Sequence, residues 1–489
     1  MGKYRLFYGI TTCVRQAHSS AVAPLSSVAV RRRVVAPHYR KIYARRKPVN
    51  YLAEEFMNAG DKDGSGPRLY DYQKMGEIVR SLPTIKEKID FVNPYERPWT
   101  VPEKTWHRLW HPALMSPRKA WLIPSIPHYF DSLDFYKYLT KMRVVDGLDQ
   151  WYDGLVPPTA SFEQRLSESL LSYFDSNIVD NEPMKLSSFL RNIVENAVQS
   201  LAHNVESLRV ARISFAPRCE SFWVRSGFMS MYELDEPDAE GKPQLERFRL
   251  PKFIGDDRRK LGELSFVLRD TFAASFRSTE QLKPLFHFSD TASLNHPIFG
   301  PDKTMDSILY SPLVYNLHPD AEPLWQCPGY EADSGETHKY GRVAIKDMSE
   351  LNDLCLHWKV SGKEEELVRK ECLAAAASVS LFSWLNAQAH CLGFTQYNDL
   401  ESPLVSQLIL SDGRDFFFAI AQLNTIAINI DVKGFTNNRT NVCFVEGPLR
   451  LYDRYDPSLF KFYCSTDKGE QEGLNPSVLS RILKMFIKD

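Results

Sequence analysis

The sequence predicts an α+β protein with a mainly helical N-terminal half. A mixed α/β C-terminal half follows, in which a long buried helix packs on a mainly antiparallel sheet. Three observations predict this class. Apolar residues recur at helical spacing through residues 186–201. Residues 372–398 form an uncharged run, and two apolar runs farther along the chain flank the pair Asp412-Gly413. An Asp-Gly pair between apolar runs is a strong hairpin signal.

Charge separates the start of the chain from the rest. The formal net charge is −1, but no Asp or Glu precedes Glu54, and Lys and Arg are frequent there. The remaining body is therefore mildly acidic. Residues 1–30 lack acidic residues, contain Arg and are rich in Ser and Ala, which is typical of a mitochondrial transit peptide. We therefore expect a mitochondrial matrix protein, with a solvated basic tail on a cytosolic protein as the alternative.

Residues 31–70 are expected to form a basic arm and a linker, since residues 60–67 are rich in Gly, Asp and Ser. Tyr39 and Tyr43 lie among the basic residues of this arm. Cationic side chains contact phosphates and aromatic rings stack on bases, so the pattern suits an RNA-binding arm. The alternative is that the arm is only the distal half of a long presequence. The candidate RNA contacts are Arg31, Arg32, Arg33, Arg40, Lys41, Arg45, Arg46 and Lys47.

The middle of the chain changes its periodicity near residue 210. Residues 71–210 form a mainly helical region, with helices expected in residues 71–92, 131–145, 162–174 and 186–201, and residues 93–128 irregular. Residues 211–350 are expected to be strand-rich and irregular. Strands are predicted at residues 213–215, 222–225 and 264–268.

Residues 351–489 are expected to form an α/β core around one long helix. Ser361 and Glu364 predict a capping box at its start, and Gly393 predicts its end about 30 residues later. The second half of this helix has no charged side, so it is either buried all round or lies in lipid. We favour burial and expect no membrane span, because Ser378, Asn386 and other polar residues lie on several of its sides.

The sheet partner of this helix is predicted directly after it. Residues 404–410 and 416–421 are expected to pair as a hairpin with a type I′ turn at Asp412-Gly413. Both runs are continuously apolar, which indicates that both faces of the sheet are covered. Residues 425–430 are expected to add a third strand, and residues 476–488 a final amphipathic helix.

The sequence contains no constellation typical of an enzyme, so we predict no catalytic, cofactor or metal site. It lacks phosphate-binding glycine motifs and a nucleophile elbow, and its eight cysteines include no Cys-x-x-Cys pair. Such cysteines suit reduced, mostly buried thiols. His107 and His111 are interpreted as packing or surface residues, and His390-Cys391 as a buried histidine beside an inert thiol. One alternative hypothesis is a matrix enzyme with a candidate site near His338, His357 and Cys391. A second alternative is a membrane-associated assembly factor.

Short motifs in the C-terminal third together resemble one protein family. They are Ser380-Leu381-Phe382-Ser383-Trp384, Ala387-Gln388-Ala389, Gly393-Phe394, Val405-Ser406-Gln407, Ser411-Asp412-Gly413, Phe416-Phe417-Phe418 and Gln422-Leu423-Asn424-Thr425. They resemble mitochondrial ribosomal proteins of the programmed-cell-death-nine type, formerly small-subunit protein thirty. The sister family, large-subunit protein thirty-seven, is similar at the last motif, but the motifs of residues 380–394 favour the first.

The resemblance implies a structural component of the mitochondrial large ribosomal subunit without catalysis. It implies contacts with ribosomal RNA and with other large-subunit proteins, including a heterodimer with the sister protein. The basic arm and the absence of a catalytic constellation agree with this implication.

Overall fold

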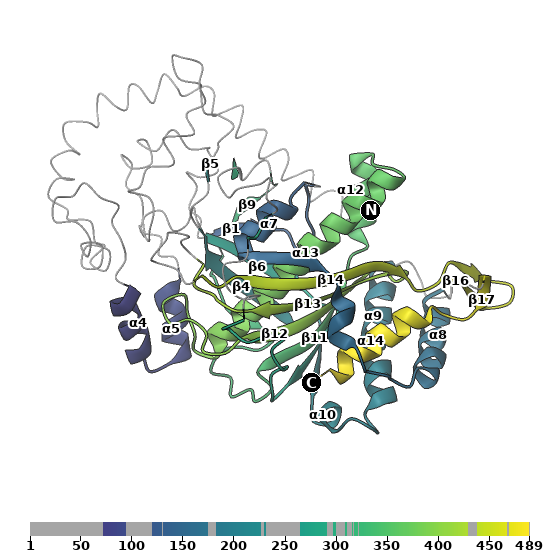
Figure 1. The fold of residues 1–489 in the computed structure, drawn as a ribbon, viewed down its shortest axis with the longest axis horizontal. Helices are drawn as coiled ribbons and strands as arrows, with labels where there is room; N and C mark the ends of the chain where they lie inside the picture. The colour runs from purple at the N-terminus through teal and green to yellow at the C-terminus, as the bar shows by residue number, and fades with distance from the viewer. Residues whose placement is uncertain are drawn as a thin grey trace, which may run out of the picture.

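A central helix lies between two β-sheets, and further helices cover the outer faces of both sheets (Figure 1). The computed structural model describes residues 72–93, 120–129, 131–174, 182–225, 229–230, 265–290, 297–299, 309–310, 315, 317–320, 322–428, 438–466 and 469–488. The predicted transit peptide and basic arm lie outside these residues.

The larger sheet has seven strands in the order β2-β14-β13-β12-β11-β7-β3. Their bounds are β2 Met142–Asp146, β3 Arg212–Phe215, β7 Ala274–Ser278, β11 Tyr340–Asp347, β12 Leu404–Ser411, β13 Asp415–Leu423 and β14 Asn441–Arg450. Four neighbouring pairs in this sheet are antiparallel, and two, β11 with β12 and β14 with β2, are parallel. The prediction of a mainly antiparallel sheet is confirmed. This sheet joins strands from all three regions predicted beyond residue 70: β2 lies before residue 210 and pairs with β14, which lies after residue 350, and β11 lies between these residues and pairs with β12. The domain boundaries near residues 210 and 350 stay predictions.

The smaller sheet has five strands in the order β10-β4-β6-β1-β9. They are β1 Ala120–Ile123, β4 Arg218–Val224, β6 Ser265–Thr271, β9 His318–Asp320 and β10 Cys327–Pro328. A three-stranded sheet joins β15 Arg454–Asp456, β16 Lys461–Thr466 and β17 Gly469–Glu472, and a short pair joins β5 Met229–Ser230 with β8 Leu309–Tyr310.

The central helix, α13 Lys363–Cys391, contacts both large sheets. Every residue from 372 to 391 is buried. Side chains of the larger sheet alternate as strand geometry requires: Leu408 and Ala419 belong to the core around α13, whereas Ile409 and Phe418 belong to the core on the opposite face. The predictions of a helix buried all round and of a sheet covered on both faces are confirmed. Among the described residues, no helix is long and apolar enough to cross a membrane.

Three amphipathic helices cover the second face of the larger sheet: α8 Ala160–Phe174, α9 Glu182–Leu201 and α14 Pro476–Ile487 (Figure 1). Their apolar spacing predicts all three correctly. Asn475 caps α14 by accepting a hydrogen bond from the Ser477 amide, and Pro476 occupies the first turn, where its missing amide hydrogen costs nothing.

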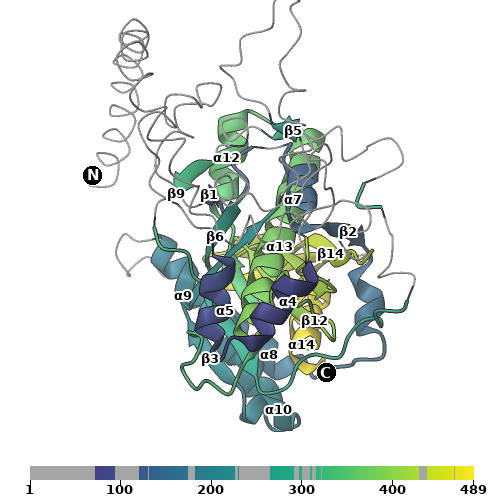
Figure 2. The same ribbon diagram turned by 90° about the vertical axis from the view of Figure 1, so that its left-hand side faces the viewer.

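Two short helices cover the outer face of the smaller sheet. They are α4 Tyr72–Ser81 and α5 Ile85–Val92, and they stand in front in Figure 2. Val79 and Ile89 of these helices share a core with Phe222 and Val267. The remaining helical elements are α7 Leu133–Thr140, η2 Leu148–Tyr152, α10 Glu206–Arg209 and α12 Glu350–Trp358.

Two expectations for the first half are wrong. The helix predicted over residues 131–145 ends at Thr140, because Lys141 adopts a left-handed conformation with φ 48° and β2 follows. β2 is a strand because it pairs in parallel with β14, about 300 residues later, and tertiary pairing outweighs local helical propensity. Residues 93–128 are not wholly irregular, since β1 pairs with β6 on one side and with β9 on the other.

The predicted capping box at the start of α13 is also wrong. The N-cap residue is Gly362, with φ 65°, and no side chain caps the helix there. Because the chain enters through this left-handed glycine, Ser361 precedes the capping position. Glu364 and its two acidic neighbours do lie in the first turn, where the helix dipole favours them. Gly393, with φ 96°, follows the end of α13 as predicted.

The hairpin is confirmed, but its turn is of another kind. Ser411 pairs with Phe416, which leaves a four-residue connection, and only Gly413 has a positive φ there. The Asp412 carboxylate accepts hydrogen bonds from the amides of Arg414 and Asp415 at 3.0 and 2.8 Å. This side chain supplies the turn that a type I′ backbone would otherwise make.

The third strand predicted at residues 425–430 is wrong for its described part. Residues 425–428 form no strand, because the Thr425 hydroxyl and the Ile426 amide bond to the Asp399 carboxylate instead. β14 is the strand that pairs with the other side of β13.

Candidate interaction surfaces and the buried polar network

The motifs that carry the family resemblance meet around α13. The Trp384 indole is buried and donates a hydrogen bond to the Pro328 carbonyl oxygen at 3.1 Å. Its ring lies against Gly341 of β11: a Cβ atom added at Gly341 would come within 2.2 Å of it. Residue 341 is therefore glycine because the indole occupies the space of a side chain.

Two polar residues of α13 bind opposite sheets. Asn386 donates to the Ser221 hydroxyl of β4 at 2.8 Å. Gln388 accepts from the Gly341 amide of β11 at 2.8 Å and donates to the Ser406 hydroxyl of β12 at 3.3 Å. Residues two apart on a helix point in nearly opposite directions, so this spacing lets one helix hold both sheets.

A buried ion pair adds a second link between the sheets. The Lys346 ammonium of β11 lies 2.8 Å from the Asp270 carboxylate of β6, and both side chains are 1% exposed. Lys346 also donates to the Ser380 hydroxyl of α13 and the Ser125 carbonyl oxygen at 2.8 and 2.7 Å. Sequence reasoning missed this cluster, although Lys346, directly after the apolar residues 343–345 of β11, was a visible signal.

The Gln422-Leu423-Asn424-Thr425 motif closes the end of β13. The side-chain oxygen of Gln422 accepts a hydrogen bond from the Leu285 backbone amide at 2.6 Å. Its side-chain nitrogen donates to the Phe286 carbonyl oxygen at 2.7 Å. Asn424 donates to the Thr440 carbonyl oxygen at 2.7 Å. The motif therefore joins a distant segment and the start of β14 to one strand end.

Asn441 completes this lock, and sequence reasoning did not assign it that role. Its side-chain oxygen, Oδ1, accepts hydrogen bonds from the backbone amides of Asn424 and Thr425 at 2.8 and 3.1 Å. Its NH2 group donates to the carbonyl oxygens of Thr140 and Thr425 at 3.0 and 3.1 Å. A side chain with four hydrogen bonds to its own protein holds a fold together and has little left to bind a ligand.

His390 and Cys391 do not form a reactive pair. His390 bonds through Nδ1 to the Asn386 carbonyl oxygen at 2.8 Å, and burial lowers its pKa to about 4. The Cys391 thiol donates to the Gln326 carbonyl oxygen, and burial raises its pKa well above the usual range. The interpretation as a buried, hydrogen-bonded histidine beside an inert thiol is confirmed.

The other thiols behave in the same way. All seven cysteines in the described part of the chain are free and buried. Burial raises the pKa of Cys372 to about 12 and that of Cys443 farther still. The thiolate is the reactive form, so these thiols are poor nucleophiles. The prediction of reduced, buried cysteines is confirmed for these seven, and Cys13 lies outside the described residues.

The acidic loop before β11 is an internal ion-pair network. Glu336 pairs with Arg212 at 2.9 Å and with the buried Arg277 at 3.4 Å. Burial raises the pKa of Glu336, but hydrogen bonds from His338 and the charges of the two arginines outweigh it, and the pKa falls to about 2. His338 bonds to Glu336 through Nδ1 and to the Val210 carbonyl oxygen through Nε2.

The proposed residues of the rival enzyme site, His338, His357 and Cys391, are not joined to one another by any hydrogen bond among the described residues. His338 and Cys391 are engaged as described, and His357 is exposed on α12. No group of three or more His, Cys, Asp or Glu side chains within the described residues is arranged to hold a metal ion. His107 and His111 lie outside these residues.

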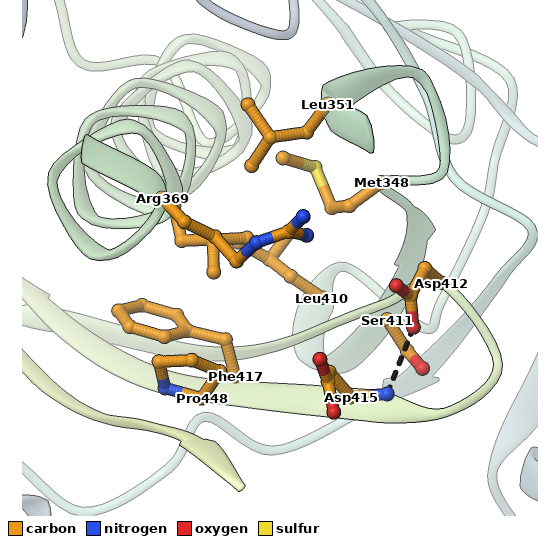
Figure 3. A pocket seen from close by; sticks show the side chains of 10 residues that line it. Met348, Leu351, Arg369, Leu410, Ser411, Asp412, Asp415, Phe417 and Pro448 are labelled. Atoms are coloured by element: carbon orange, nitrogen blue, oxygen red, sulfur yellow. Dashed lines mark hydrogen bonds between the residues drawn. The ribbon is translucent and has the colours of Figure 1, made fainter. Parts of the chain in front are cut away.

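Two cavities among the described residues are candidate binding sites. One is an open groove of about 720 Å³ beside the acidic loop, lined by Tyr330, Asp333 and Cys391 among others. The other lies under the β12–β13 turn, where Arg369 faces the apolar side chains of Leu410 and Phe417 (Figure 3). Its free volume is about 10 Å³, close to that of one water molecule. It is too small for an organic ligand.

The predicted RNA contacts, the eight basic residues between 31 and 47, lie outside the described residues.

The family of the chain follows from comparison with a family model. The family model described as mitochondrial 28S ribosomal protein S30 (PDCD9) matches residues 10–489. That description names the 28S, or small, subunit, which differs from the large-subunit placement implied by the resemblance in the sequence. The buried motifs described above and this match, which covers nearly the whole sequence, agree: the chain belongs to the family of mitochondrial 28S ribosomal protein S30 (PDCD9).

Proposed function

We propose that the protein is a non-catalytic structural component of the mitochondrial ribosome in the matrix, where it binds ribosomal RNA and neighbouring ribosomal proteins. The observation that carries this proposal is the family match over residues 10–489. The polar side chains in and beside the family motifs support it, because Gln388, Asn386 and Asn441 bond inward to the protein's own backbone and side chains.

We place the protein in the large subunit, on the resemblance of its C-terminal motifs. Sedimentation of a tagged protein from a mitochondrial lysate tests both the assembly and the subunit. We expect the tag to follow the large-subunit RNA through the gradient, also after the two subunits are separated at low magnesium concentration. A tag that followed the small-subunit RNA would show that the family description names the right subunit, and a tag confined to the free-protein fractions would refute the ribosomal role.

The basic arm is the proposed RNA contact. Its candidate residues are Arg31, Arg32, Arg33, Arg40, Lys41, Arg45, Arg46 and Lys47. Each cation that neutralises a phosphate adds to the salt dependence of binding, by roughly 0.7 to 0.9 in the slope of log affinity against log salt. Replacing all eight by Gln should weaken binding to purified ribosomal RNA and flatten this slope by several units.

A matched control keeps this experiment specific. Lys359 and Lys363 are exposed at the turn between α12 and α13. Replacing both by Gln removes charge from the body and should leave RNA affinity and salt slope nearly unchanged. Equal losses in the arm variant and in this control would contradict a contact localised in the arm.

The body is proposed to dock on protein, including the sister large-subunit protein thirty-seven as a heterodimer partner. The resemblance implies this pairing, and the mildly acidic charge of the body beyond residue 53 suits contact with protein better than with phosphate. Co-expression of the two chains followed by gel filtration tests it. A single peak containing both chains in equal amounts is expected, whereas separate elution would contradict a stable heterodimer.

A further inference from the structure

The turn between β15 and β16 exposes two adjacent apolar side chains. Leu459 is 56% exposed and Phe460 is 67% exposed. Among the described residues, the other exposed phenylalanine and tryptophan side chains, Phe215 and Trp325, are less exposed than Phe460. Single exposed apolar residues are common on protein surfaces, but neighbouring ones at the end of a projecting element are typical of contact sites.

The backbone holds Phe460 in an unfavourable conformation. Its φ is 55°, in the left-handed region that side chains other than Gly, Asn and Asp rarely adopt. The Asp456 carboxylate fixes the same turn by accepting from the amide and hydroxyl of Ser458, at 2.9 and 2.6 Å. A glycine or asparagine would fit this position without strain, so the phenyl ring is retained against a local conformational cost.

The base of the turn is packed against the body of the protein. We call strands β15 to β17 and the turn of residues 457–460 the β-arm. It extends from one end of the molecule, where β16 and β17 are labelled in Figure 1. At its base, Tyr455 stacks on Phe174 of α8 with ring centroids 4.6 Å apart, and on Phe462 at 4.9 Å. Packing of this kind presents the tip in one orientation, which lowers the entropy cost of binding.

The charges of the β-arm indicate what it contacts. Arg454 pairs with Glu470 at 3.1 Å, and Lys461 pairs with Glu472 at 2.8 Å. These two cations beside the tip are therefore paired with carboxylates. The tip itself presents the apolar side chains of Leu459 and Phe460, which carry no charge. RNA is bound chiefly through its phosphates, whereas an apolar tip with balanced flanks complements an apolar protein pocket.

A second copy of this chain is a poor occupant. Of the two cavities described above, one holds only about 10 Å³ and the other is lined mainly by polar and acidic residues. Two side chains alone also bury far less surface than the roughly 1,200 Å² that a specific interface between two proteins requires. The tip must therefore act as one anchor within a larger contact, as aromatic anchors do at the centre of protein interfaces.

We propose that Leu459 and Phe460 insert into an apolar pocket of a neighbouring protein in the ribosomal particle. This inference rests on the proposed function, because the particle supplies the neighbour. It deepens that function by naming the element of this chain that anchors it.

The test compares tip variants with the wild type inside cells. Leu459→Ser with Phe460→Asn removes both apolar side chains, and asparagine accepts the left-handed conformation. The double variant should therefore fold with unchanged or higher thermal stability. Expressed together with differently tagged wild type, its share of the sedimented particle should fall about tenfold relative to its share of total protein.

Leu356→Gln is the matched control. Leu356 is 76% exposed on α12, outside the β-arm, and glutamine has a similar helical propensity. This variant should incorporate as well as wild type. Equal incorporation of the tip variant would overturn the docking inference and leave the ribosomal role intact. Absence of the wild type from the particle would overturn both.

Cross-linking identifies the class of partner. A photoreactive benzoylphenylalanine placed at position 460 should cross-link to another ribosomal protein within the sedimented particle. Cross-links to ribosomal RNA alone, or to a second copy of this chain, would overturn the inference.

Discussion

The core around α13 and the β-arm use charge in opposite ways. In the core, Lys346 and Asp270 form an ion pair shielded from water, and Lys346 also donates a hydrogen bond to Ser380 of the central helix. In the β-arm, Arg454 and Lys461 pair with acids that remain about half exposed, while carbon side chains occupy the tip. The comparison teaches that the buried polar groups of this protein link its own elements, whereas the exposed apolar side chains of the β-arm are available to partners.

Breaking the buried ion pair should have the largest effect. Lys346→Met leaves the Asp270 carboxylate buried without its counter-charge, which should lower the free energy of unfolding by about 3–5 kcal/mol. Urea denaturation measures this loss. Adding Asp270→Leu to the variant should restore much of the stability, since it removes the uncompensated charge. A single variant as stable as wild type would contradict the role of this pair.

Filling the space beside Trp384 should cost somewhat less. In Gly341→Ala the new methyl group meets the buried indole, and this overpacking should lower the free energy of unfolding by about 2–3 kcal/mol. Residue 341 has no positive φ, so the clash with the indole alone accounts for this loss. Gly335→Ala separates the two causes, because residue 335 has φ 74° and open space around it, and it should cost about 1–2 kcal/mol of backbone strain only. A Gly341→Ala variant as stable as wild type would contradict the steric account.

Mild acid should weaken the core through His390. Its pKa is about 4 in the folded protein and 6.5 when unfolded, so the unfolded state binds the proton more readily. Stability from this residue is complete above pH 6.5 and is lost as the pH falls toward 4. The free energy of unfolding should be about 2 kcal/mol lower at pH 5 than at pH 7.5. His390→Gln should abolish most of this difference, and an unchanged pH profile in that variant would assign the effect to other groups.

Breaking an exposed pair of the β-arm should have the smallest effect. Lys461→Met removes the partner of Glu472, but both side chains reach water, which solvates the remaining carboxylate. We expect the urea midpoint to stay within the error of measurement. A loss comparable to that of Lys346→Met would mean that the arm, like the core, depends on its ion pairs.

Much of the fold was predictable because its strongest signals are local. The uncharged run of α13 and the apolar stripes of α9 and α14 appear within single segments, so the elements were recognised with boundaries close to those observed. The strand β2 was missed for the opposite reason. Its conformation depends on pairing with β14, which a window of neighbouring residues does not contain.

The buried polar network was less predictable than the fold. The polar residues of α13 were visible, and they favoured burial in the protein, but their partners lie on strands far away in the chain. Asn441 illustrates the difficulty, since its bonds reach Thr140 as well as Thr425. Satisfying a buried amide is a property of the assembled structure, so residue type alone does not reveal it.

The seven shielded sulfur atoms give the protein its own reporter of opening. Maleimide reagents modify thiols only where water and reagent reach them, so the native state should remain unlabelled at these positions. Each transient exposure leaves a permanent mass tag on one cysteine. The labelling rates of Cys464 in the β-arm, Cys443 in β14 and Cys372 in α13 can be measured separately. They rank how often each of these elements opens to solvent.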